Sequence, residues 1–287
     1  MKAKRLSNQS DSREFPHFNK MDISHYKLSI FLRCPKQYWF EYLDPYTSKW
    51  EVKKQLKKPR PELEVGTFIH ITLNNFFTVS KEKRSINTLK KLLEETWKPP
   101  RGEEKGFINK MEERIWYQDA LKMLLNFYKF QTDPEHIFYV PDPHSREELI
   151  KVKINEKYSL QGKIDRIDKT ERGLHIIDYK TGKGEDDEFQ VMTYVLIAKN
   201  KYQLPVSRAS YFYLRTGKFR SFDPTEQKEK ATLKRIISVV EAIEREKDFV
   251  PRPTKLCGWC DYIDFCPAKN QATKLLNTTE KAEGLPF

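Results

Sequence analysis

Long apolar runs are missing from this sequence of 287 residues. None approaches the roughly 20 apolar residues that a bilayer-spanning helix needs, so we expect no membrane span. Residues 1–20 are polar throughout and lack the apolar stretch of a secretory signal, which predicts a loose basic arm and a cytoplasmic protein. Cysteine is scarce as well, and four cysteines in a reducing compartment are not expected to form two structural disulfides.

Repeats and nucleotide-binding loops are also absent. The sequence shows no internal period of about 20 to 50 residues, which argues against a solenoid. The phosphate loop G-x-x-x-x-G-K-[ST] does not occur. We therefore expect no helicase motor in this sequence, and either action on pre-existing single strands or a separate partner that unwinds the duplex.

Positive charge is abundant. Lys and Arg total 53 against 41 Asp and Glu, which gives a formal net charge of +12. Such an excess favours a polyanionic partner, and in the absence of apolar runs that partner is expected to be nucleic acid rather than a membrane. Residues 49–61 concentrate this charge, with six Lys or Arg in their first twelve positions, and predict a mobile basic loop.

Hydrophobic periodicity divides the chain into a helical part and a part that mixes strands with helices. Helical spacing predicts helices at 26–43, interrupted at Cys34–Pro35, and at 66–80, 86–97 and 108–131. Apolar or alternating segments predict three consecutive strands of a meander at 149–155, 158–168 and 174–180. Then follow a predicted helix at 186–200, strands at 206–214 and 218–222, and an amphipathic helix at 224–247. This order is typical of an α/β protein with a mixed sheet flanked by helices.

A single domain over residues 21–272 is the expected organisation. Its predicted parts are a mainly helical segment at 21–145, a core at 146–250 and a cysteine cluster at 251–272. Periodicity ends after Pro267, and residues 273–287 predict a flexible tail.

Carboxylates and a lysine gather in the segments GKIDRID and IIDYKTGK. Asp178 and Lys180 are two residues apart on a predicted strand, so both side chains point to one face. Asp165 precedes Asp178 by 13 residues with a turn between them, so a hairpin can place the two side by side. Two carboxylates form a hard oxygen site for Mg²⁺ or Mn²⁺, where Lys180 would stabilise charge on a phosphate or orient water. The alternative is a solvated strand, but Ile176–Ile177 indicate a buried one, in which ionic groups need partners.

Four short motifs follow one another in a characteristic order. They are GTFIH at 66–70, GKID at 162–165, DYK at 178–180 and QVMTY at 190–194. In this order they resemble the RecB-like branch of the PD-(D/E)xK nuclease superfamily, which includes the CRISPR-associated RecB-like exonucleases and the AddB nuclease domain. The resemblance covers roughly residues 22 to 267 and implies a restriction-endonuclease-like α/β core.

The resemblance also implies roles for single residues. His70, Asp165 and Asp178 would bind the metal, together with the backbone carbonyl of Tyr179, and Lys180 would be the catalytic lysine. Without the resemblance, the sequence would favour a structural role for His70, as a histidine on a helix with its hydrogen bonds satisfied.

Two further residues gain a role from the resemblance. Gln190 and Tyr194 lie four apart on one helical face and would line the DNA path beside the metal. Ordinary helix packing is the alternative for this pair.

Three of the four cysteines lie close together near the C-terminus. The C-x₂-C-x₅-C spacing of Cys257, Cys260 and Cys266 suits a soft metal, but a closed site needs a fourth ligand. No histidine follows His175, which excludes a local Cys₃His zinc site, and Cys34 is the one cysteine that remains. The spacing leaves zinc and iron–sulfur open. The resemblance implies a 4Fe–4S cluster, because iron–sulfur members of the branch combine one cysteine in an N-terminal R-C-P-like helix with three near the C-terminus.

These features predict a metal-dependent DNA nuclease, specifically an exonuclease of single-stranded DNA in repair, recombination or CRISPR spacer processing. Two alternatives remain open: a structure-specific endonuclease with the same site, and a non-catalytic iron–sulfur DNA-binding module of a larger complex. A separate helicase or CRISPR adaptation proteins would be the protein partners. Candidates for stacking on unpaired bases, with core packing as the alternative for each, are Trp39, Tyr42, Trp50 and Trp259.

Overall fold

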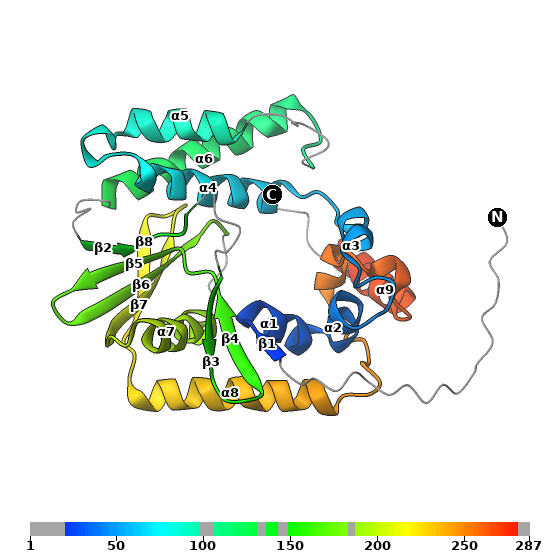
Figure 1. Ribbon diagram of the computed structural model, residues 1–287. Helices are drawn as coiled ribbons and strands as arrows, with labels where there is room; N and C mark the ends of the chain where they lie inside the picture. Colours follow the sequence, from blue (N-terminus) through cyan, green and yellow to red (C-terminus); the bar gives the residue numbers. More distant parts are fainter. Residues whose placement is uncertain (1–20, 98–105, 131–135, 143–148, 183–186, 281–287) are drawn as a thin grey trace.

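A computed structural model provides the fold (Figure 1). It describes residues 21–97, 106–130, 136–142, 149–182 and 187–280. The predicted basic arm at 1–20 lies outside the described residues. No helix in the described ranges is long and apolar enough to cross a membrane.

Helices make up most of the first half of the chain and recur after the strands. The α-helices are α1 His25–Arg33, α2 Pro35–Tyr42, α3 Trp50–Leu56, α4 Pro61–Thr78, α5 Ile86–Thr96, α6 Lys110–Phe130, α7 Glu188–Tyr202, α8 Glu226–Arg245 and α9 Lys269–Glu280. The short 3₁₀ helices are η1 Lys81–Lys83, η4 Lys255–Trp259 and η5 Ile263–Phe265. The predicted break at Cys34–Pro35 is confirmed, because Cys34 ends α1 and precedes α2, whose first residue is Pro35.

The strands form two sheets. They are β1 Met21–Ile23, β2 Ile137–Tyr139, β3 Ile150–Lys153, β4 Tyr158–Gly162, β5 Arg166–Thr170, β6 Gly173–Lys180, β7 Val206–Tyr213 and β8 Lys218–Phe222. The larger sheet has the order β2-β5-β6-β7-β8, in which β6 and β7 are parallel and the other pairs are antiparallel. The smaller sheet has the order β1-β4-β3. The mixed α/β architecture is the predicted one.

The side chains of β6 alternate between two hydrophobic clusters, one on each face of the larger sheet. Leu174 and Ile176 pack with α7, α8 and the smaller sheet. Ile177 and Tyr179 pack on the other face with α4, α5 and α6. The larger sheet therefore lies between two helical layers (Figure 1). Because successive strand residues point to opposite faces, Asp178 must share the α7 face with Ile176.

The three-strand meander predicted for 149–180 is wrong in its connectivity. Four strands occupy this region, and the predicted strand at 158–168 is in fact β4 and β5, which belong to different sheets. The chain leaves one sheet after Gly162 and enters the other at Arg166. Residues 163–165 cross this junction, which places Asp165 just before β5 rather than inside a strand.

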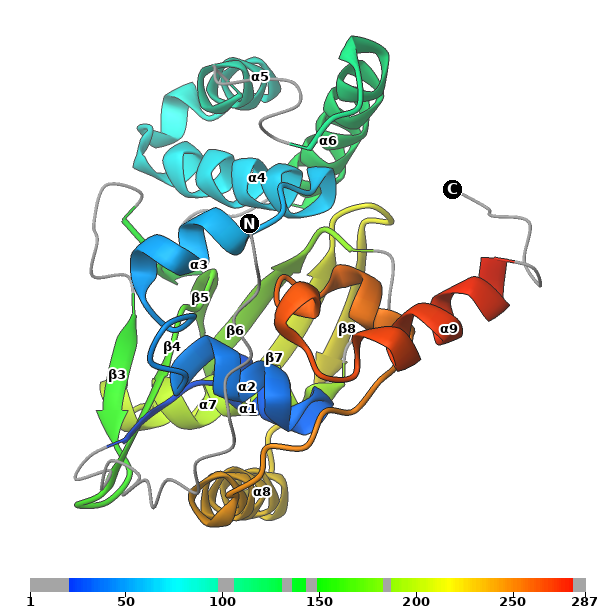
Figure 2. The ribbon, with the colours of Figure 1, turned by 90° about the vertical axis from the view of Figure 1, so that its right-hand side faces the viewer.

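Two segments predicted without regular structure are helical. Within the predicted basic loop at 49–61, residues 50–56 form α3, whose Lys, Glu and Leu residues are good helix formers despite the charge. Within the predicted tail at 273–287, residues 273–280 belong to α9, and residues 281–287 lie outside the described part. Helix α9 packs on η4 and η5 and buries Ala272. We refer to residues 251–280 as the cysteine lobe; Figure 2 shows it beside α1 and α2, with strands of the larger sheet behind.

Candidate active site

The three predicted acid and lysine residues come together at the ends of β5 and β6. In the β5–β6 ladder, Arg166 pairs with Ile177, so the preceding Asp165 lies beside Asp178. Lys180 follows two residues later on the same face, and its Nζ lies 3.0 Å from Asp178 Oδ2. The predicted hairpin geometry for this cluster is confirmed, although Asp165 itself precedes the strand.

Asp165 is a fully bonded carboxylate. Its Oδ1 lies 2.9 Å from His70 Nδ1, and its Oδ2 accepts the backbone N–H of Tyr179 at 2.8 Å. Burial opposes protonation of His70, but the charge of Asp165 and this hydrogen bond outweigh it and raise the pKa of the imidazole. A histidine of α4 is therefore attached to the strand pair through Asp165, and its predicted role as a metal ligand stays a prediction.

Asp178 has the opposite environment. It is 4% exposed, and its Oδ2 forms an ion pair with Lys180 Nζ at 3.0 Å without a well-aligned hydrogen bond in the described part of the chain. Burial first, and the charge of Asp165 second, raise the pKa of Asp178 to about 6. A buried carboxylate of this kind is stabilised by additional positive charge.

Lys180 is held on three sides. Besides the contact with Asp178, its Nζ donates a hydrogen bond of 2.5 Å to Gln190 Oε1 and lies 4.8 Å from the centre of the Tyr211 ring. Gln190 Nε2 in turn donates to Tyr194 OH at 3.1 Å. Gln190 of the predicted α7 pair therefore contacts the predicted catalytic lysine directly, and Tyr194 is linked to it through Gln190.

Two motif glycines allow helices to approach this site closely. A Cβ atom at Gly162 would lie 2.8 Å from the Tyr194 ring, and one at Gly66 would lie 3.1 Å from Thr181 Oγ1. Larger residues at these positions would push α7 away from β4 and α4 away from the end of β6. Glycine at both motif positions therefore has a packing reason.

A cavity of about 380 Å³ opens over these side chains. Its lining includes every predicted metal and lysine residue and the α7 pair, together with Thr67, Ile71, Asn74 and Lys163. Asn74 is 3% exposed and lies one helical turn after His70, a spacing that could have revealed it in the sequence. Burial lowers the pKa of Lys163, while Asp165 opposes this effect. The sequence analysis identified neither Asn74 nor Lys163 as a site residue.

The donor chemistry of this cavity suits a hard cation. Within the described residues, no group of three or more His, Cys, Asp or Glu side chains is already arranged to hold a metal ion, and His70 and Asp165 are bonded to each other. Asp178 nevertheless offers a buried carboxylate beside Asp165, and burial together with the Asp165 charge raises its pKa despite the nearby Lys180 ammonium. Carboxylate oxygens with these properties fit Mg²⁺ or Mn²⁺.

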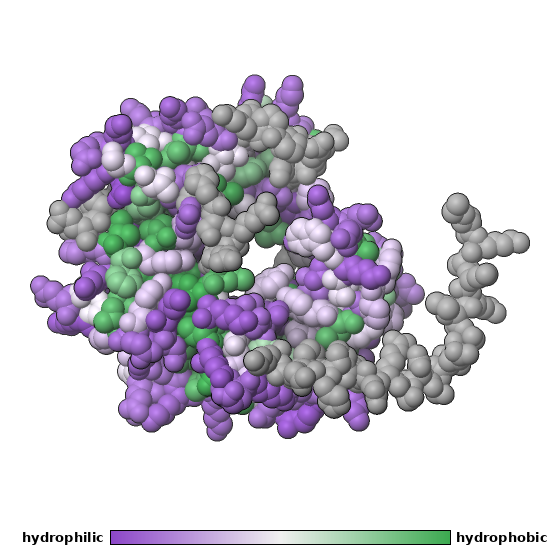
Figure 3. All heavy atoms as spheres, in the orientation of Figure 1, coloured by the Kyte–Doolittle hydropathy of each residue, from purple (hydrophilic) through white to green (hydrophobic). Residues whose placement is uncertain are grey.

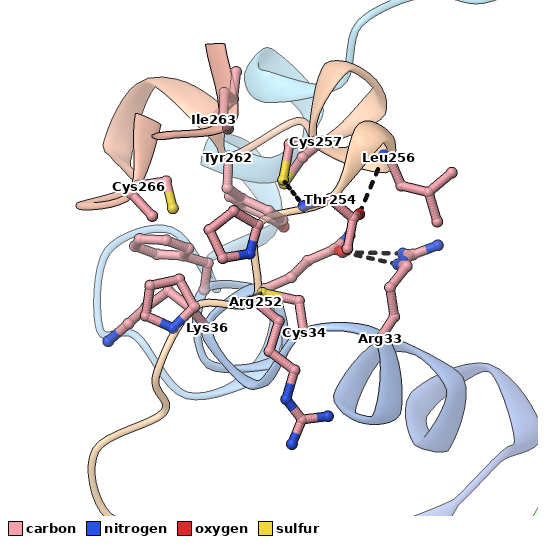
Figure 4. Close-up of a pocket in the computed structure, with 17 residues that line it drawn as sticks. Arg33, Cys34, Lys36, Arg252, Thr254, Leu256, Cys257, Tyr262, Ile263 and Cys266 are labelled. Atoms are coloured by element: carbon pink, nitrogen blue, oxygen red, sulfur yellow. Dashed lines mark hydrogen bonds between the residues drawn. The ribbon is translucent and has the colours of Figure 1, made fainter. Parts of the chain in front are cut away.

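All four cysteines line one pocket, although Cys34 is far from the others in sequence (Figure 4). None of them forms a disulfide. Backbone N–H groups donate to two of the thiols, from Arg252 to Cys34 Sγ at 3.5 Å and from Thr254 to Cys257 Sγ at 3.3 Å. Burial, with a smaller contribution from the other three cysteines, raises the pKa of Cys260 to about 11. Cys34 therefore shares a pocket with the C-terminal cysteines, although in the described part of the chain no three cysteines are already arranged to hold a metal ion, and the four-cysteine site stays a prediction.

Polar contacts also join the cysteine lobe to the N-terminal helices. Tyr262 OH donates to Glu41 of α2 at 2.5 Å, and Arg252 donates to the Leu32 carbonyl of α1 at 2.9 Å. Arg60, in the linker between α3 and α4, forms an ion pair with Asp261. The lobe is therefore attached both to α1 and α2 and to the segment that precedes α4.

The sequence model of the PD-(D/E)XK nuclease superfamily matches residues 22–267, and the chain belongs to this superfamily. It is 27% identical over 221 residues to one subunit of the ATP-dependent helicase/deoxyribonuclease of Carboxydothermus hydrogenoformans, a match that covers 67% of this chain and 19% of that protein. It is 26% identical over 159 residues to the "Gene 69 protein" of Mycobacterium phage D29, covering 53% of this chain and 59% of that protein. The chain therefore spans about a fifth of the first relative and about three fifths of the second.

A solved structure from Eubacterium rectale, described as a candidate exonuclease, is similar to the chain with a TM-score of 0.47 and 14% identity. The alignment covers 89% of this chain and 94% of that one.

Replacing Tyr211 with phenylalanine should destabilise the start of α7. The Tyr211 hydroxyl donates to the Asp187 carbonyl at 2.6 Å and accepts the Val191 N–H at 3.3 Å, so it bridges the first turn of the helix. Loss of this bridge removes the hydroxyl partner of the buried Val191 N–H and of the partly buried Asp187 carbonyl, and it should cost about 1 to 3 kcal/mol in the free energy of unfolding. Urea denaturation measures this value. Tyr46→Phe, at a 58% exposed tyrosine, is the control, and equal stability of the two variants would contradict the bridging role.

Proposed function

We propose that this chain is a metal-dependent deoxyribonuclease that degrades single-stranded DNA from an end. One observation carries the proposal: the buried Asp178 carboxylate, whose Oδ2 is paired with the Lys180 ammonium, lies beside a second buried carboxylate, Asp165, in an open cavity. A purely structural ion pair would have no need for a second buried carboxylate at this place.

The residues of the cavity divide into a metal-binding group and a lysine group. His70, Asp165 and Asp178, with the carbonyl of Tyr179, would hold Mg²⁺ or Mn²⁺. When bound, the cation supplies Lewis acidity and makes water a nucleophile at neutral pH. The Lys180 ammonium, fixed by Gln190, is oriented to stabilise negative charge on the phosphate under attack.

An opening beside the cavity supports the preference for single strands. Figure 3 shows an opening through the molecule, and Figure 1 shows that it is bordered by the sheet, α4, α1 and the cysteine lobe. A flexible single strand enters a closed passage by its end more easily than a stiff duplex does. The net charge of +12 provides phosphate attraction that does not depend on sequence.

A comparison of linear and circular forms of the same single strand tests this proposal. With Mn²⁺ and matched salt, the linear strand should be degraded, whereas the covalently closed circle should largely resist because it has no end to thread. Linear duplex should be degraded more slowly than the linear single strand. Equal rates on the linear and circular strands would favour the structure-specific endonuclease instead, and no cleavage of any form would favour the non-catalytic DNA-binding module.

The shared pocket supports a 4Fe–4S cluster held by Cys34, Cys257, Cys260 and Cys266. Four thiolates suit this cluster, and backbone N–H···S contacts such as those to Cys34 and Cys257 tune such centres. The cluster would close the lobe onto α1 and α2, and a reducing compartment such as the cytoplasm would maintain it. Zinc in the same four-cysteine site is the alternative.

A separate helicase is the partner that we propose for action on duplex DNA. Its support is the name of the relative from Carboxydothermus hydrogenoformans, which combines helicase and deoxyribonuclease. CRISPR adaptation proteins are the second class of partner consistent with a nuclease of this branch. The genomic neighbours of this sequence would distinguish the two.

A further inference from the structure

The aromatic residues considered for base stacking do not hold a strand inside the active-site cavity. Among the described residues that line this cavity, none belongs to that group. Trp39 and Tyr42 pack against the hydrophobic core, as the alternative interpretation predicted, whereas Trp50 and Trp259 are 71% and 55% exposed. Contacts to a strand within the cavity must therefore come from its polar lining.

One face of α4 forms a wall of the cavity. The residues of this face are Thr67, His70, Ile71 and Asn74, whose spacings of three and four residues place them in one stripe along the helix. Exposure falls along the stripe, from 38% for Ile71 to 3% for Asn74. Asn74 therefore lies at an enclosed end of the cavity, one turn beyond the candidate metal ligand His70.

The side-chain amide of Asn74 has no hydrogen-bond partner in the described part of the chain, although the residue is buried. Thr72, another buried polar residue of α4, bonds instead to Thr96 of α5. The amide oxygen and nitrogen of Asn74 are not fully enclosed, so they reach the cavity that the residue lines. The amide is therefore directed into the cavity rather than into the packing of α4 against its neighbouring helices.

An amide in this position does not serve the stability of the fold. Burying most of an amide without a protein partner costs free energy. Asparagine is also a weaker helix former than leucine, which has nearly the same size. An apolar residue at position 74 would therefore suit the fold at least as well, and violations of this kind are expected at functional sites.

The charges of the cavity indicate which class of ligand the amide would bind. Lys163 and Lys180 line the cavity together with Asp165 and Asp178, so the two cations equal the two carboxylates in number. A bound divalent cation would leave an excess of positive charge, which attracts an anion. Phosphate oxygens accept hydrogen bonds, and asparagine side chains are among the groups that donate to them in complexes with nucleic acids.

We propose that the Asn74 amide donates a hydrogen bond from Nδ2 to a phosphate of the substrate strand, next to the phosphate that is cleaved. This inference rests on the proposed function and specifies how the strand is positioned. The cleaved phosphate would lie at the cation and Lys180, so a group one helical turn beyond His70 reaches its neighbour. A phosphate contact carries no sequence information but fixes the register of the strand.

Binding of a very short strand tests this contact. The full-length protein, at mildly alkaline pH in EDTA to prevent hydrolysis, is titrated with a fluorescent thymidine trinucleotide, which has few other phosphates to contact. Asn74→Leu should weaken binding about tenfold, because it removes a hydrogen bond to a charged group. Asn74→Asp should weaken binding further, because it adds a third carboxylate that repels the phosphate.

The neighbouring asparagine provides the matched controls. Asn75 follows on α4 and is half-buried, but it does not line the cavity. Asn75→Leu and Asn75→Asp make the same changes of size and charge and should bind the trinucleotide as the wild type does. Wild-type affinity of either Asn74 variant would overturn the contact. Because aspartate has the shape of asparagine, the Asp variant decides the question even if leucine disturbs the fold.

Two further measurements separate the contact from other roles of Asn74. Thermal denaturation should show Asn74→Leu to be at least as stable as the wild type, and calorimetric titration should show unchanged Mn²⁺ affinity. Weaker Mn²⁺ binding with wild-type affinity for the trinucleotide would overturn the phosphate contact and assign the amide to the cation. Cleavage with Mn²⁺ is measured separately, so the expected binding losses in a protein that does not cleave would refute the nuclease and leave the contact intact.

Discussion

Replacing Lys180 with alanine should abolish Mn²⁺-dependent DNA cleavage while leaving DNA affinity almost unchanged. The ammonium is fixed by Asp178, Gln190 and the Tyr211 ring, so it is oriented before substrate arrives. Loss of one such charge-stabilising donor lowers kcat by about 10² to 10³-fold. Binding should be preserved because phosphate contacts are spread over many of the 53 Lys and Arg residues.

Single-turnover cleavage and anisotropy titration measure these two quantities. Lys169→Ala is the matched control, since Lys169 is an exposed strand lysine on β5 outside the cavity. Full activity of the Lys180 variant would show that the active site is assigned to the wrong residues. A parallel loss of cleavage and affinity would make Lys180 a binding residue rather than a catalytic one.

The Asp165→Ala and Asp178→Ala variants should be as inactive as the Lys180→Ala variant. Combining the two substitutions should lower activity little further, because the effects of residues that act as a unit are not additive. Their stabilities should differ. Asp165 accepts bonds from His70 and from the Tyr179 backbone, so its removal breaks buried contacts. Asp178 has a raised pKa, which means that its ionised form opposes folding at neutral pH. We therefore expect Asp178→Ala to fold at least as well as Asp165→Ala, as thermal denaturation can show.

Local patterns were sufficient to predict much of this site. Two-residue spacing placed Asp178 and Lys180 on one face, and four-residue spacing placed Gln190 and Tyr194 together, because strand and helix periods fix these relations. The hairpin length placed Asp165 beside Asp178. Such features depend on short segments whose geometry is nearly independent of the rest of the fold.

Relations between distant segments could not be predicted in the same way. An apolar alternation at 158–168 does not reveal that the chain changes sheets at residue 163, because both halves have the same period. Tyr211 supports Lys180 only through the parallel pairing of β6 with β7, which is set by a crossover helix. The high charge of α3 suggested a loop although its residues favour a helix, and α9 is stabilised by packing on η4 and η5 rather than by a strong pattern of its own.

Replacing Cys34 with serine should remove the metal of the cysteine lobe as completely as replacing Cys260. Cys34 lies 223 positions before Cys257 but lines the same pocket, and its Sγ accepts the Arg252 N–H of the lobe. If all four thiolates bind one 4Fe–4S cluster, the wild-type protein purified without oxygen should be brown, with absorption at about 400 nm and iron and sulfide in equal amounts. Both variants should lose this absorption.

The same substitution should loosen the whole fold, because the cluster would close a very long loop. A disulfide that closes a loop of this length contributes roughly 5 kcal/mol, and the cluster should act in the same direction. Thermal denaturation with iron and zinc analysis measures both effects, and Arg33→Ala, which alters the same pocket without a sulfur, is the control. A colourless wild-type protein with one zinc would refute the cluster but keep the four-cysteine site. Unchanged metal content in Cys34→Ser would instead remove Cys34 from the ligands, and the lobe would then be held to α1 and α2 only by contacts such as Tyr262 to Glu41.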